Sequence, residues 1–233
     1  MLSLIIPTYN EAENIKTQVQ RICKVLKQPF EILIVDDNSP DGTGKIADNL
    51  AKKYPVRVIH RTGKRGFESA AMEGLSQAQG EIIGYIDADQ SHPPELLPEL
   101  LDTINNGADI AVASRKVGNG RTLGWNSYRH IISWGATMLA WPLTSVKDRT
   151  SGYFLFRREV IDGKKLNLIG YKIMLEVVVR SQSKRVVEVP FTFINRKEGK
   201  SKTNTRMLVA YARHLERLYL YKIGRVFYVL RKE

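Results

Sequence analysis

The chain of 233 residues carries 36 Lys and Arg against 24 Asp and Glu, a formal net charge of +12, and 43% of its residues are hydrophobic. Such a chain can bury one large core or two small ones, and its surface should attract an anionic partner: nucleic acid, an acidic membrane or a phosphorylated ligand. The single Cys23 excludes an internal disulfide and any zinc site built from several cysteines.

The N-terminal segment MLSLIIPTYNEAEN has no basic start and only a short apolar run, so we expect neither a signal peptide nor a membrane span there. A transmembrane helix needs about 18 to 20 apolar residues in a row, and no stretch of the sequence supplies them. The longest run without a charge, 131–146, is broken by Ser, Thr, Gly and Pro, and is expected to lie at an interface or in a core.

Short β-rich runs alternate with helix-compatible segments in the first half of the chain. The runs are LSLIIP, EILIVDD, VRVIH, EIIGYIDAD and ADIAVASR, and the expected helices are 11–27, 43–53, 67–79 and 94–106. Asp41-Gly-Thr is a start signal for the second helix, and Asn106-Gly107 is a stop signal for the fourth. This alternation predicts an α/β domain with a mostly parallel sheet covered by helices on both faces.

The pattern changes after about residue 115, where we expect a lid or acceptor region built onto the sheet. In chain order it comprises a Gly-rich loop KVGNGRTLG, a helical segment with Trp125, Trp134 and Trp141, the strand-like SGYFLFRRE, a helix near 170–182, the strand EVPFTFI, the basic loop NRKEGKSKTN and a long final helix. No internal repeat or linker separates the two halves, which favours one domain.

Polar clusters follow three of the expected strands, at the edge where an open α/β sheet binds its ligands. They are Pro7-Thr-Tyr-Asn-Glu11, Asp36-Asp37-Asn-Ser39 and Asp87-Ala-Asp89. The i, i+2 spacing lets Asp87 and Asp89 converge as oxygen ligands of Mg²⁺ or Mn²⁺, with diphosphate oxygens completing the coordination. The alternative is a solvated turn in which Asp89 or Ser91 caps the next helix.

The second cluster and a nearby Gly-containing segment bear on nucleotide binding. Asp37 could accept hydrogen bonds from a base or ribose and Tyr9 could stack beside the base, although each alone also fits a turn residue or a packed aromatic. The segment TGKRGFESA contains neither the dinucleotide-binding GxGxxG pattern nor a Walker loop, which weakens dehydrogenase and NTPase hypotheses.

Several segments, taken together and in order, resemble the inverting glycosyltransferases of family 2, which have the GT-A fold. They are IIPTYNEAENI, VDDNSPDGT, GYIDADQSHPPE, ASRKVGNG, RHIISWGA, DRTSGYFLFRREV and VPFTFINRKEGKSK. Within that family the resemblance is to members that transfer mannose from GDP-mannose to a polyprenyl (dolichyl) phosphate. It implies a GT-A (Rossmann-like) domain over 1–205, with a nucleotide-sugar half at 1–115 and an acceptor half at 116–205, followed by a basic amphipathic helix at 206–233.

The resemblance also implies roles for individual positions. The nucleotide sugar would be held by Pro7, Tyr9, Glu11, Val35, Asp37, Asp87, Ala88 and Asp89. The metal, Mg²⁺ or Mn²⁺, would be held by Asp87 and Asp89, and Ser91 stands where many relatives carry a glutamine ligand. The acceptor phosphate would be held by Arg115, Arg129, Ser133, Arg196 and Lys202, and the expected catalytic residues are Asp89, Arg115 and Arg129.

A phosphate acceptor changes what the protein must supply. Its second pKa is about 6, so it is largely a dianion at neutral pH and needs no general base. The protein must instead hold two anionic groups close together, and an arginine suits this because it binds phosphate through two parallel hydrogen bonds. Asp148 and Glu176 are the other carboxylates of interest, and neither is assigned a proton-transfer role.

Two segments are suited to a membrane surface, where a polyprenyl phosphate resides. Residues 125–146 combine three tryptophans with aliphatic side chains, as interfacial segments do, although the segment could equally pack on the sheet. The final helix places Arg206, Arg213 and Arg217 on one stripe, with His214 and Arg225 beside it and a wide apolar face opposite. That helix could also pack on the domain or bind a small membrane subunit.

The expected location is therefore the cytoplasmic side of a membrane, as a peripheral protein. Two other functions stay open at this stage. One keeps the fold and the metal but uses glucose or N-acetylhexosamine as the sugar, or a glycan hydroxyl as the acceptor. The other takes the +12 charge as nucleic-acid binding, which is disfavoured because no groove-reading motif occurs and the strand-end carboxylates would repel phosphates.

Overall fold

The computed structural model describes residues 1–63, 66–183, 185–195 and 205–230. Its main sheet has seven strands in the order β3-β2-β1-β4-β7-β5-β8. Their bounds are β1 Leu2–Thr8, β2 Phe30–Asp36, β3 Val56–His60, β4 Ile82–Tyr85, β5 Ile110–Ser114, β7 Phe154–Arg157 and β8 Val186–Pro190. All neighbouring pairs are parallel except those of β7, which runs antiparallel to β4 and β5. The expected α/β class with a mostly parallel sheet is confirmed.

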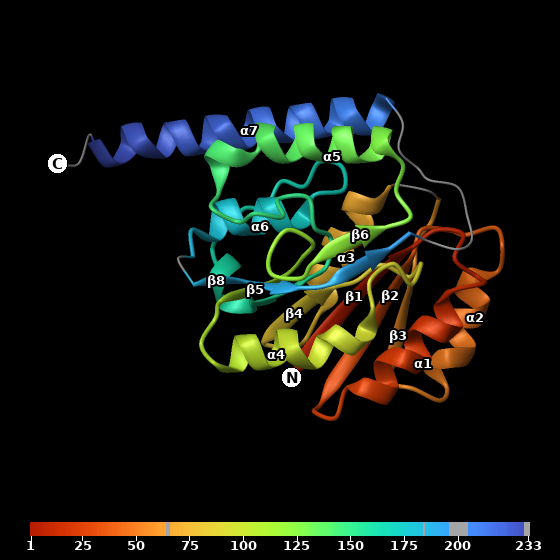
Figure 1. Ribbon diagram of the computed structural model, residues 1–233. Helices are drawn as coiled ribbons and strands as arrows, with labels where there is room; N and C mark the ends of the chain where they lie inside the picture. Colours follow the sequence, from red (N-terminus) through yellow and green to blue (C-terminus); the bar gives the residue numbers. More distant parts are fainter. Residues whose placement is uncertain (64–65, 184, 196–204, 231–233) are drawn as a thin grey trace.

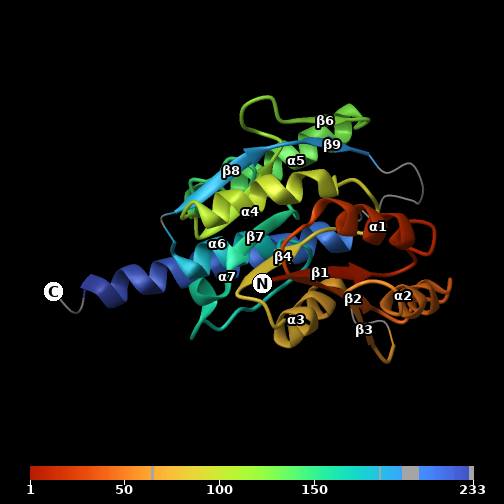
Figure 2. The same ribbon diagram turned by 90° about the horizontal axis from the view of Figure 1, so that it is seen from below.

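Helices cover both faces of this sheet (Figure 2). Their bounds are α1 Ile15–Val25, α2 Thr43–Ala51, α3 Phe67–Gln77, α4 Leu97–Asn105 and α6 Ile173–Ser181. Side chains alternate between the faces along each strand: Leu4 and Ile6 of β1 pack with α1, α2 and α4, whereas Ile5 packs with α3 and α6. Because both faces are buried, the strands are almost continuously apolar, and this is why they were recognisable in the sequence.

The structure also contains three short 3₁₀ turns and a small second sheet. The turns are Pro94–Leu96, Trp141–Leu143 and Arg158–Ile161, and the second sheet pairs β6 Arg121–Leu123 with β9 Thr192–Ile194. The expected strand EVPFTFI is therefore two strands. β8 belongs to the main sheet, and after Phe191 the chain leaves that sheet to form β9. The Gly-rich loop KVGNGRTLG likewise contains β6, which was not expected.

Two helices lie together across one end of the molecule. Figure 1 shows α7 (Thr205–Leu230) along the top of the view with α5 (Ser127–Leu139) beside it. Hydrogen bonds join them: Tyr211 donates to the carbonyl of Ala136 (2.7 Å), and Tyr219 donates to the carbonyl of Leu139 (2.6 Å). An apolar cluster joins α7 to α6 and to the segment that follows α5. It is formed by Ala140, Leu143, Leu175, Val179, Leu215 and Leu218. Within the described residues, no helix is both long and apolar enough to cross a membrane.

Two of the four expected helices begin later than expected, whereas the helices expected at 43 and 67 begin at those residues. The first begins at Ile15 rather than at residue 11, because residues 11–14 form a turn closed by Glu11 and Asn14. The fourth begins with a 3₁₀ turn at Pro94 and becomes α-helical at Leu97. Of the three tryptophans expected in one helix, only Trp134 lies in α5, whereas Trp125 precedes it and Trp141 follows in a 3₁₀ turn.

Candidate active site

The three polar clusters lie at neighbouring strand ends, since β1 pairs with both β2 and β4. Each cluster contains, or is directly followed by, a non-glycine residue with positive φ: Asn10 (58°), Asn38 (59°) and Gln90 (61°). Asparagine tolerates this left-handed conformation better than most residues, and such conformations are concentrated at functional sites. The three left-handed residues come directly after Tyr9, Asp37 and Asp89, the residues that the sequence singled out.

The acidic pair lies after β4, where the structure gives its two carboxylates different surroundings. The Asp89 side chain is buried, and one of its oxygens accepts hydrogen bonds from the backbone N–H (3.1 Å) and hydroxyl (2.6 Å) of Ser91. The Asp87 side chain is 39% exposed, and its carbonyl accepts a bond from Gln18 (2.9 Å). Both residues line one cavity, which agrees with the expected metal site but does not test it.

His92 contacts both the backbone and the carboxylate of Asp87, a role that the sequence did not reveal. Its Nδ1 accepts a hydrogen bond from the backbone N–H of Asp87 (3.3 Å) and lies 3.5 Å from the carboxylate. The imidazole stacks on Tyr153 with 5.2 Å between ring centroids, and Phe191 and Phe193 approach it edge-on. Since it is 4% exposed, His92 fixes the backbone of the acidic pair rather than presenting itself to solvent.

The donor atoms at this position fit a divalent cation with an open coordination sphere. Asp87, Asp89 and Ser91 offer oxygen atoms, which Mg²⁺ and Mn²⁺ prefer. Among the residues that the structure describes, no group of three His, Cys, Asp or Glu side chains forms a closed metal site. A cation held here would need further oxygen ligands, which a diphosphate can supply.

The nucleotide side is built on β1 and β2. Their register places Pro7 beside Val35 and Thr8 beside Asp36. Val35 is fully buried, whereas Pro7, Tyr9 and Glu11 keep part of their surface accessible. The backbone N–H of Glu11 donates to the hydroxyl of Thr43 at the start of α2 (2.9 Å), and the Glu11 carboxylate accepts a bond from Asn14 (3.0 Å). These contacts fix the loop that carries the expected nucleoside-binding residues.

Asp37 has a structural partner that was not anticipated. One of its carboxylate oxygens accepts a bond from Arg61 (2.6 Å), and the other accepts the backbone N–H of Gly66 (2.9 Å). Both side chains are almost fully buried, and Arg61 also bonds to Glu73 (3.0 Å) and Ser69 (2.7 Å). Asp37 therefore ties β2 to the segment before α3. Its expected contact with a nucleoside stays a prediction.

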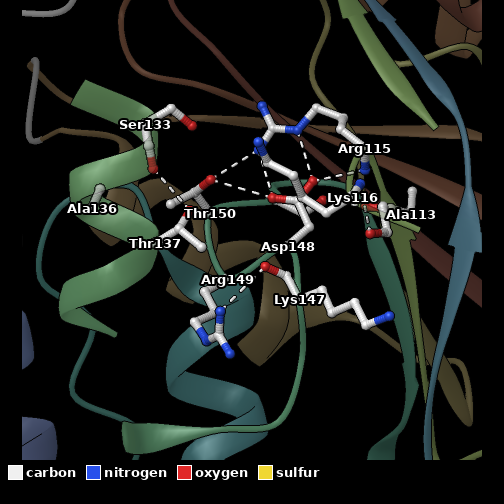
Figure 3. A network of polar contacts seen from close by, with 12 residues as sticks. Ala113, Arg115, Lys116, Ser133, Ala136, Thr137, Lys147, Asp148, Arg149 and Thr150 are labelled. Atoms are coloured by element: carbon white, nitrogen blue, oxygen red, sulfur yellow. Dashed lines mark hydrogen bonds and ion pairs between the residues drawn. The ribbon is translucent and has the colours of Figure 1, made fainter. Parts of the chain in front are cut away.

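On the other side of the cavity, Arg115 is paired with Asp148 (Figure 3). The carboxylate of Asp148 accepts two bonds from the guanidinium, both 2.7 Å, and one from the backbone N–H of Arg115 (2.9 Å). The guanidinium also donates to the hydroxyl of Thr150 (2.9 Å). Burial alone would raise the pKa of Asp148, but the hydrogen bonds and charge of Arg115 hold it below its ordinary value.

Trp125 is close to both of the expected catalytic arginines. The guanidinium carbon of Arg129 is 4.5 Å from the centre of its ring, and that of Arg115 is 5.3 Å away. Arg129 also donates to the side-chain oxygen of Asn195 (2.8 Å), immediately after β9. Trp125 thus contacts two arginines from different segments, whereas the sequence predicted for it either membrane contact or packing on the sheet.

A cavity of about 260 Å³ connects these groups. Its lining includes the oxygen-bearing side chains of Asp87, Asp89 and Ser91 and the cationic side chains of Arg115, Arg129 and Lys172. It also includes largely apolar side chains from the two outer helices, Ile132 and Ala136 of α5 and Met207, Leu208 and Tyr211 of α7. Ser133 also lines the cavity, whereas Arg196 and Lys202 lie outside the described residues.

The final helix differs from its expected orientation in one respect. Arg213 and Arg217 are exposed, as expected for the basic stripe, and the side chain of Arg206 lies outside the described part. His214 does not flank the stripe: it is fully buried, and its Nε2 lies 2.8 Å from the carboxylate of Glu176. The apolar face that includes Leu215 and Leu218 packs on the protein, so this face is not available to a membrane. The burial of His214 is explained by the tertiary structure, because α6 carries the buried carboxylate of Glu176 with which the His214 ring pairs.

An exposed apolar surface, which we term the α5 face, extends along the outer side of α5. It consists of Tyr128, Ile131, Trp134, Met138, Leu139 and, just beyond the helix, Trp141, with exposed fractions between 46% and 67%. α5 has no buried residue at all. Leu208 and Val209 of α7 are exposed as well, and Leu208 also lines the cavity. Large apolar side chains gathered on one exposed helix are typical of a binding surface.

Comparisons with known proteins agree with this geometry. The model of the family described as "Glycosyl transferase family 2" matches residues 3–163. The chain is 45% identical over 222 residues to a dolichol-phosphate mannosyltransferase of Pyrococcus furiosus, covering 93% of this chain and 63% of that protein. It is 36% identical over 235 residues to the dolichol-phosphate mannosyltransferase of Saccharomyces cerevisiae, covering 95% and 88%. The chain thus spans less than two thirds of the Pyrococcus protein.

Among solved structures, the mannosyltransferase PcManGT of Pyrobaculum calidifontis, in complex with GDP-Man and Mn²⁺, has a similar fold. The superposition has a TM-score of 0.64 at 18% identity and covers 96% of this chain and 64% of that one. Since the identity is low, this likeness concerns the fold.

Proposed function

The chain belongs to glycosyl transferase family 2, and we propose that it transfers mannose from GDP-mannose to a polyprenyl (dolichyl) phosphate with inversion at the sugar. In this proposal Asp87 and Asp89, with Ser91 beside them, hold a divalent cation and the donor diphosphate. Arg115, Arg129 and Ser133 hold the acceptor phosphate. Two named relatives that match most of this chain are dolichol-phosphate mannosyltransferases, and this supports the choice of sugar and acceptor.

The observation that carries the proposal is that three kinds of group line one cavity. They are carboxylates, cationic side chains and apolar side chains of α5 and α7. A lipid phosphate has matching parts, because its anionic headgroup would meet the cations and its first prenyl units would meet the apolar side chains. A glycan hydroxyl acceptor would need polar groups in place of these apolar side chains.

The chemistry follows from where the charges lie. A divalent cation at the acidic pair would stabilise the negative charge that develops on the leaving diphosphate. An oxygen of the acceptor phosphate forms the new bond to the anomeric carbon while the bond to the diphosphate breaks, and the electron pair leaves with GDP. No proton has to be removed from the phosphate, so the side chains orient and screen two anions that would otherwise repel each other.

The α5 face supports a location at a membrane surface. Trp134, Trp141 and Tyr128 are the side-chain types that settle at headgroup depth, and Ile131 and Met138 lie among them. The net charge of +12 would favour an anionic leaflet, at about 1 kcal/mol for each basic residue near the surface. We propose peripheral attachment at the cytoplasmic leaflet, with room for a small membrane subunit, and 1–115 and 116–205 as the donor and acceptor halves of one domain.

The experiment is a donor panel. The protein is incubated with GDP-mannose, UDP-glucose or UDP-N-acetylglucosamine, Mg²⁺ or Mn²⁺, and a short polyprenyl phosphate, and lipid-linked sugar and released nucleoside diphosphate are measured. Metal-dependent mannolipid formed only from GDP-mannose is the expected result. Transfer from another donor alone would refute the proposed sugar, and transfer to a glycan hydroxyl but not to the lipid phosphate would refute the proposed acceptor.

A further inference from the structure

Lys172 is a cavity residue that none of the sequence motifs identified. It immediately precedes α6, and its Nζ donates one hydrogen bond, to the carbonyl of Thr150 (2.9 Å). An ammonium group has three N–H donors, and no second partner for it occurs among the described residues. The side chain lines the cavity together with Arg115 and Asp87, so its remaining donors lie next to the space that the substrates would occupy.

The charges around Lys172 show why a cation is needed there. Arg115 is paired with Asp148, and both side chains are almost fully buried, so the pair adds little net charge to the cavity. An acceptor phosphate brings a charge of about −1.5 to −2 at pH 7. Lys172 contacts a neutral carbonyl and, among the described residues, forms no ion pair of its own. It therefore contributes a positive charge that is not already neutralised by a contact.

The environment disfavours an ammonium group when no anion is present. Burial, together with the positive charge of Arg115, lowers the pKa of Lys172 to about 8, while the charges of Asp148 and Asp87 act in the opposite direction. A fold that encloses a lysine with a single hydrogen bond carries a cost that an anionic ligand would remove. The position and the unused donors both point to a phosphate.

We propose that Lys172 is a further residue of the acceptor site, whose ammonium group donates hydrogen bonds to the phosphate of the polyprenyl acceptor. This inference rests on the proposed function, which it deepens by naming a cation that contacts the reacting phosphate. Lys172 comes from the start of α6 and Arg129 from α5, and both line the cavity, so that the two side chains would hold different oxygens of the phosphate. Specificity for a phosphate over a neutral prenol would follow.

The test compares the wild-type protein with Lys172→Gln, which keeps a donor for the Thr150 carbonyl but has no charge. Lys147→Met is the matched control, because Lys147 is exposed and its side chain extends away from Arg115 in Figure 3. With a short polyprenyl phosphate, we expect Lys172→Gln to raise the acceptor KM about tenfold or more, the usual effect of losing a charged hydrogen bond. We expect its KM for GDP-mannose to stay within twofold, and Lys147→Met to change neither value.

An acceptor KM within twofold of wild type in folded Lys172→Gln would overturn the inference, and so would a donor KM that rises as much as the acceptor KM. Lys172→Met, which keeps the aliphatic stem, is the second variant if Lys172→Gln fails to fold, and the same criteria apply to it.

Equilibrium binding separates this inference from the proposed function. Binding of the short prenyl phosphate and of the corresponding prenol is measured without any nucleotide sugar. We expect wild type to prefer the phosphate by about tenfold or more and Lys172→Gln to lose that preference. If the donor panel yields no lipid-linked sugar but the preference depends on Lys172, the inference holds and the proposed reaction fails. If wild type binds phosphate and prenol equally, the inference is wrong.

Discussion

Replacing Asp148 with alanine should be among the most destabilising single changes in this protein. The carboxylate is fully buried and accepts bonds from the Nε, Nη2 and backbone N–H groups of Arg115 and, at 3.3 Å, from Thr150. The variant leaves the Arg115 guanidinium, with a side chain 8% exposed, without its counter-charge. Removing one partner of a buried pair costs about 3–5 kcal/mol, a large part of the roughly 5–15 kcal/mol that stabilises a typical domain.

The measurement is urea denaturation followed by far-UV circular dichroism, with thermal unfolding as a second reading. We expect the free energy of unfolding to fall by about 3–5 kcal/mol and the Tm by roughly 6–20 °C. Asp48→Ala is the control, because Asp48 also contacts a basic side chain, His60 (2.8 Å), but both side chains are about half exposed. Such a surface pair contributes about 1 kcal/mol at most.

The effect of Asp148→Ala should also depend on pH. Because the pKa of Asp148 is lowered in the folded protein, the charged carboxylate stabilises the fold above its unfolded pKa, and this contribution is lost as the pH falls through the folded pKa. The stabilities of wild type and variant should therefore converge below about pH 4. A loss under about 1 kcal/mol at pH 7, or a difference that grows as the pH falls, would refute the reasoning.

Four further changes test the site and its surroundings. Asp89→Ala should lower kcat about 100-fold or more with saturating metal, whereas the control Asp102→Ala, at an exposed position, should not. Activity of Asp89→Ala within a few-fold of wild type would contradict the metal assignment. Arg129→Ala should raise the acceptor KM about tenfold and leave the donor KM within twofold, and an equal rise in both would place Arg129 elsewhere. Ile131→Glu combined with Trp134→Glu should abolish flotation of the protein with anionic vesicles. The control is Val187→Glu, exposed on β8, which should still float. Retained flotation of the double variant would exclude the α5 face as the docking surface. Glu176→Gln should speed amide hydrogen exchange in α7, because it removes the charge that His214 and Arg180 contact. The control is Glu216→Gln, at an exposed position of the same helix. Exchange no faster than in this control would show that the contact with Glu176 does not hold the helix.

Much of the architecture could be predicted because its signals are local. The strands that form β1, β2 and β4 are mostly apolar, and turn residues follow them directly, so their place in a buried, mostly parallel sheet was predictable and is confirmed. The family assignment is confirmed as well, because it depends on short segments that are each continuous in sequence. Asp87 and Asp89 belong to one such segment, and their assignment to a metal stays a prediction.

The sequence by itself determined the alternation of strands and helices, the edge of the sheet that carries the polar clusters and the family. Only the tertiary structure decided which distant charged groups meet. Arg115 is held by Asp148, 33 residues away, and His214 is buried against Glu176. The tertiary structure also decided that His92 contacts Asp87 and that Lys172 lines the cavity. The physical reason is that periodicity reports which face of one element is apolar, whereas a pairing between charges depends on which distant elements the sheet order brings together.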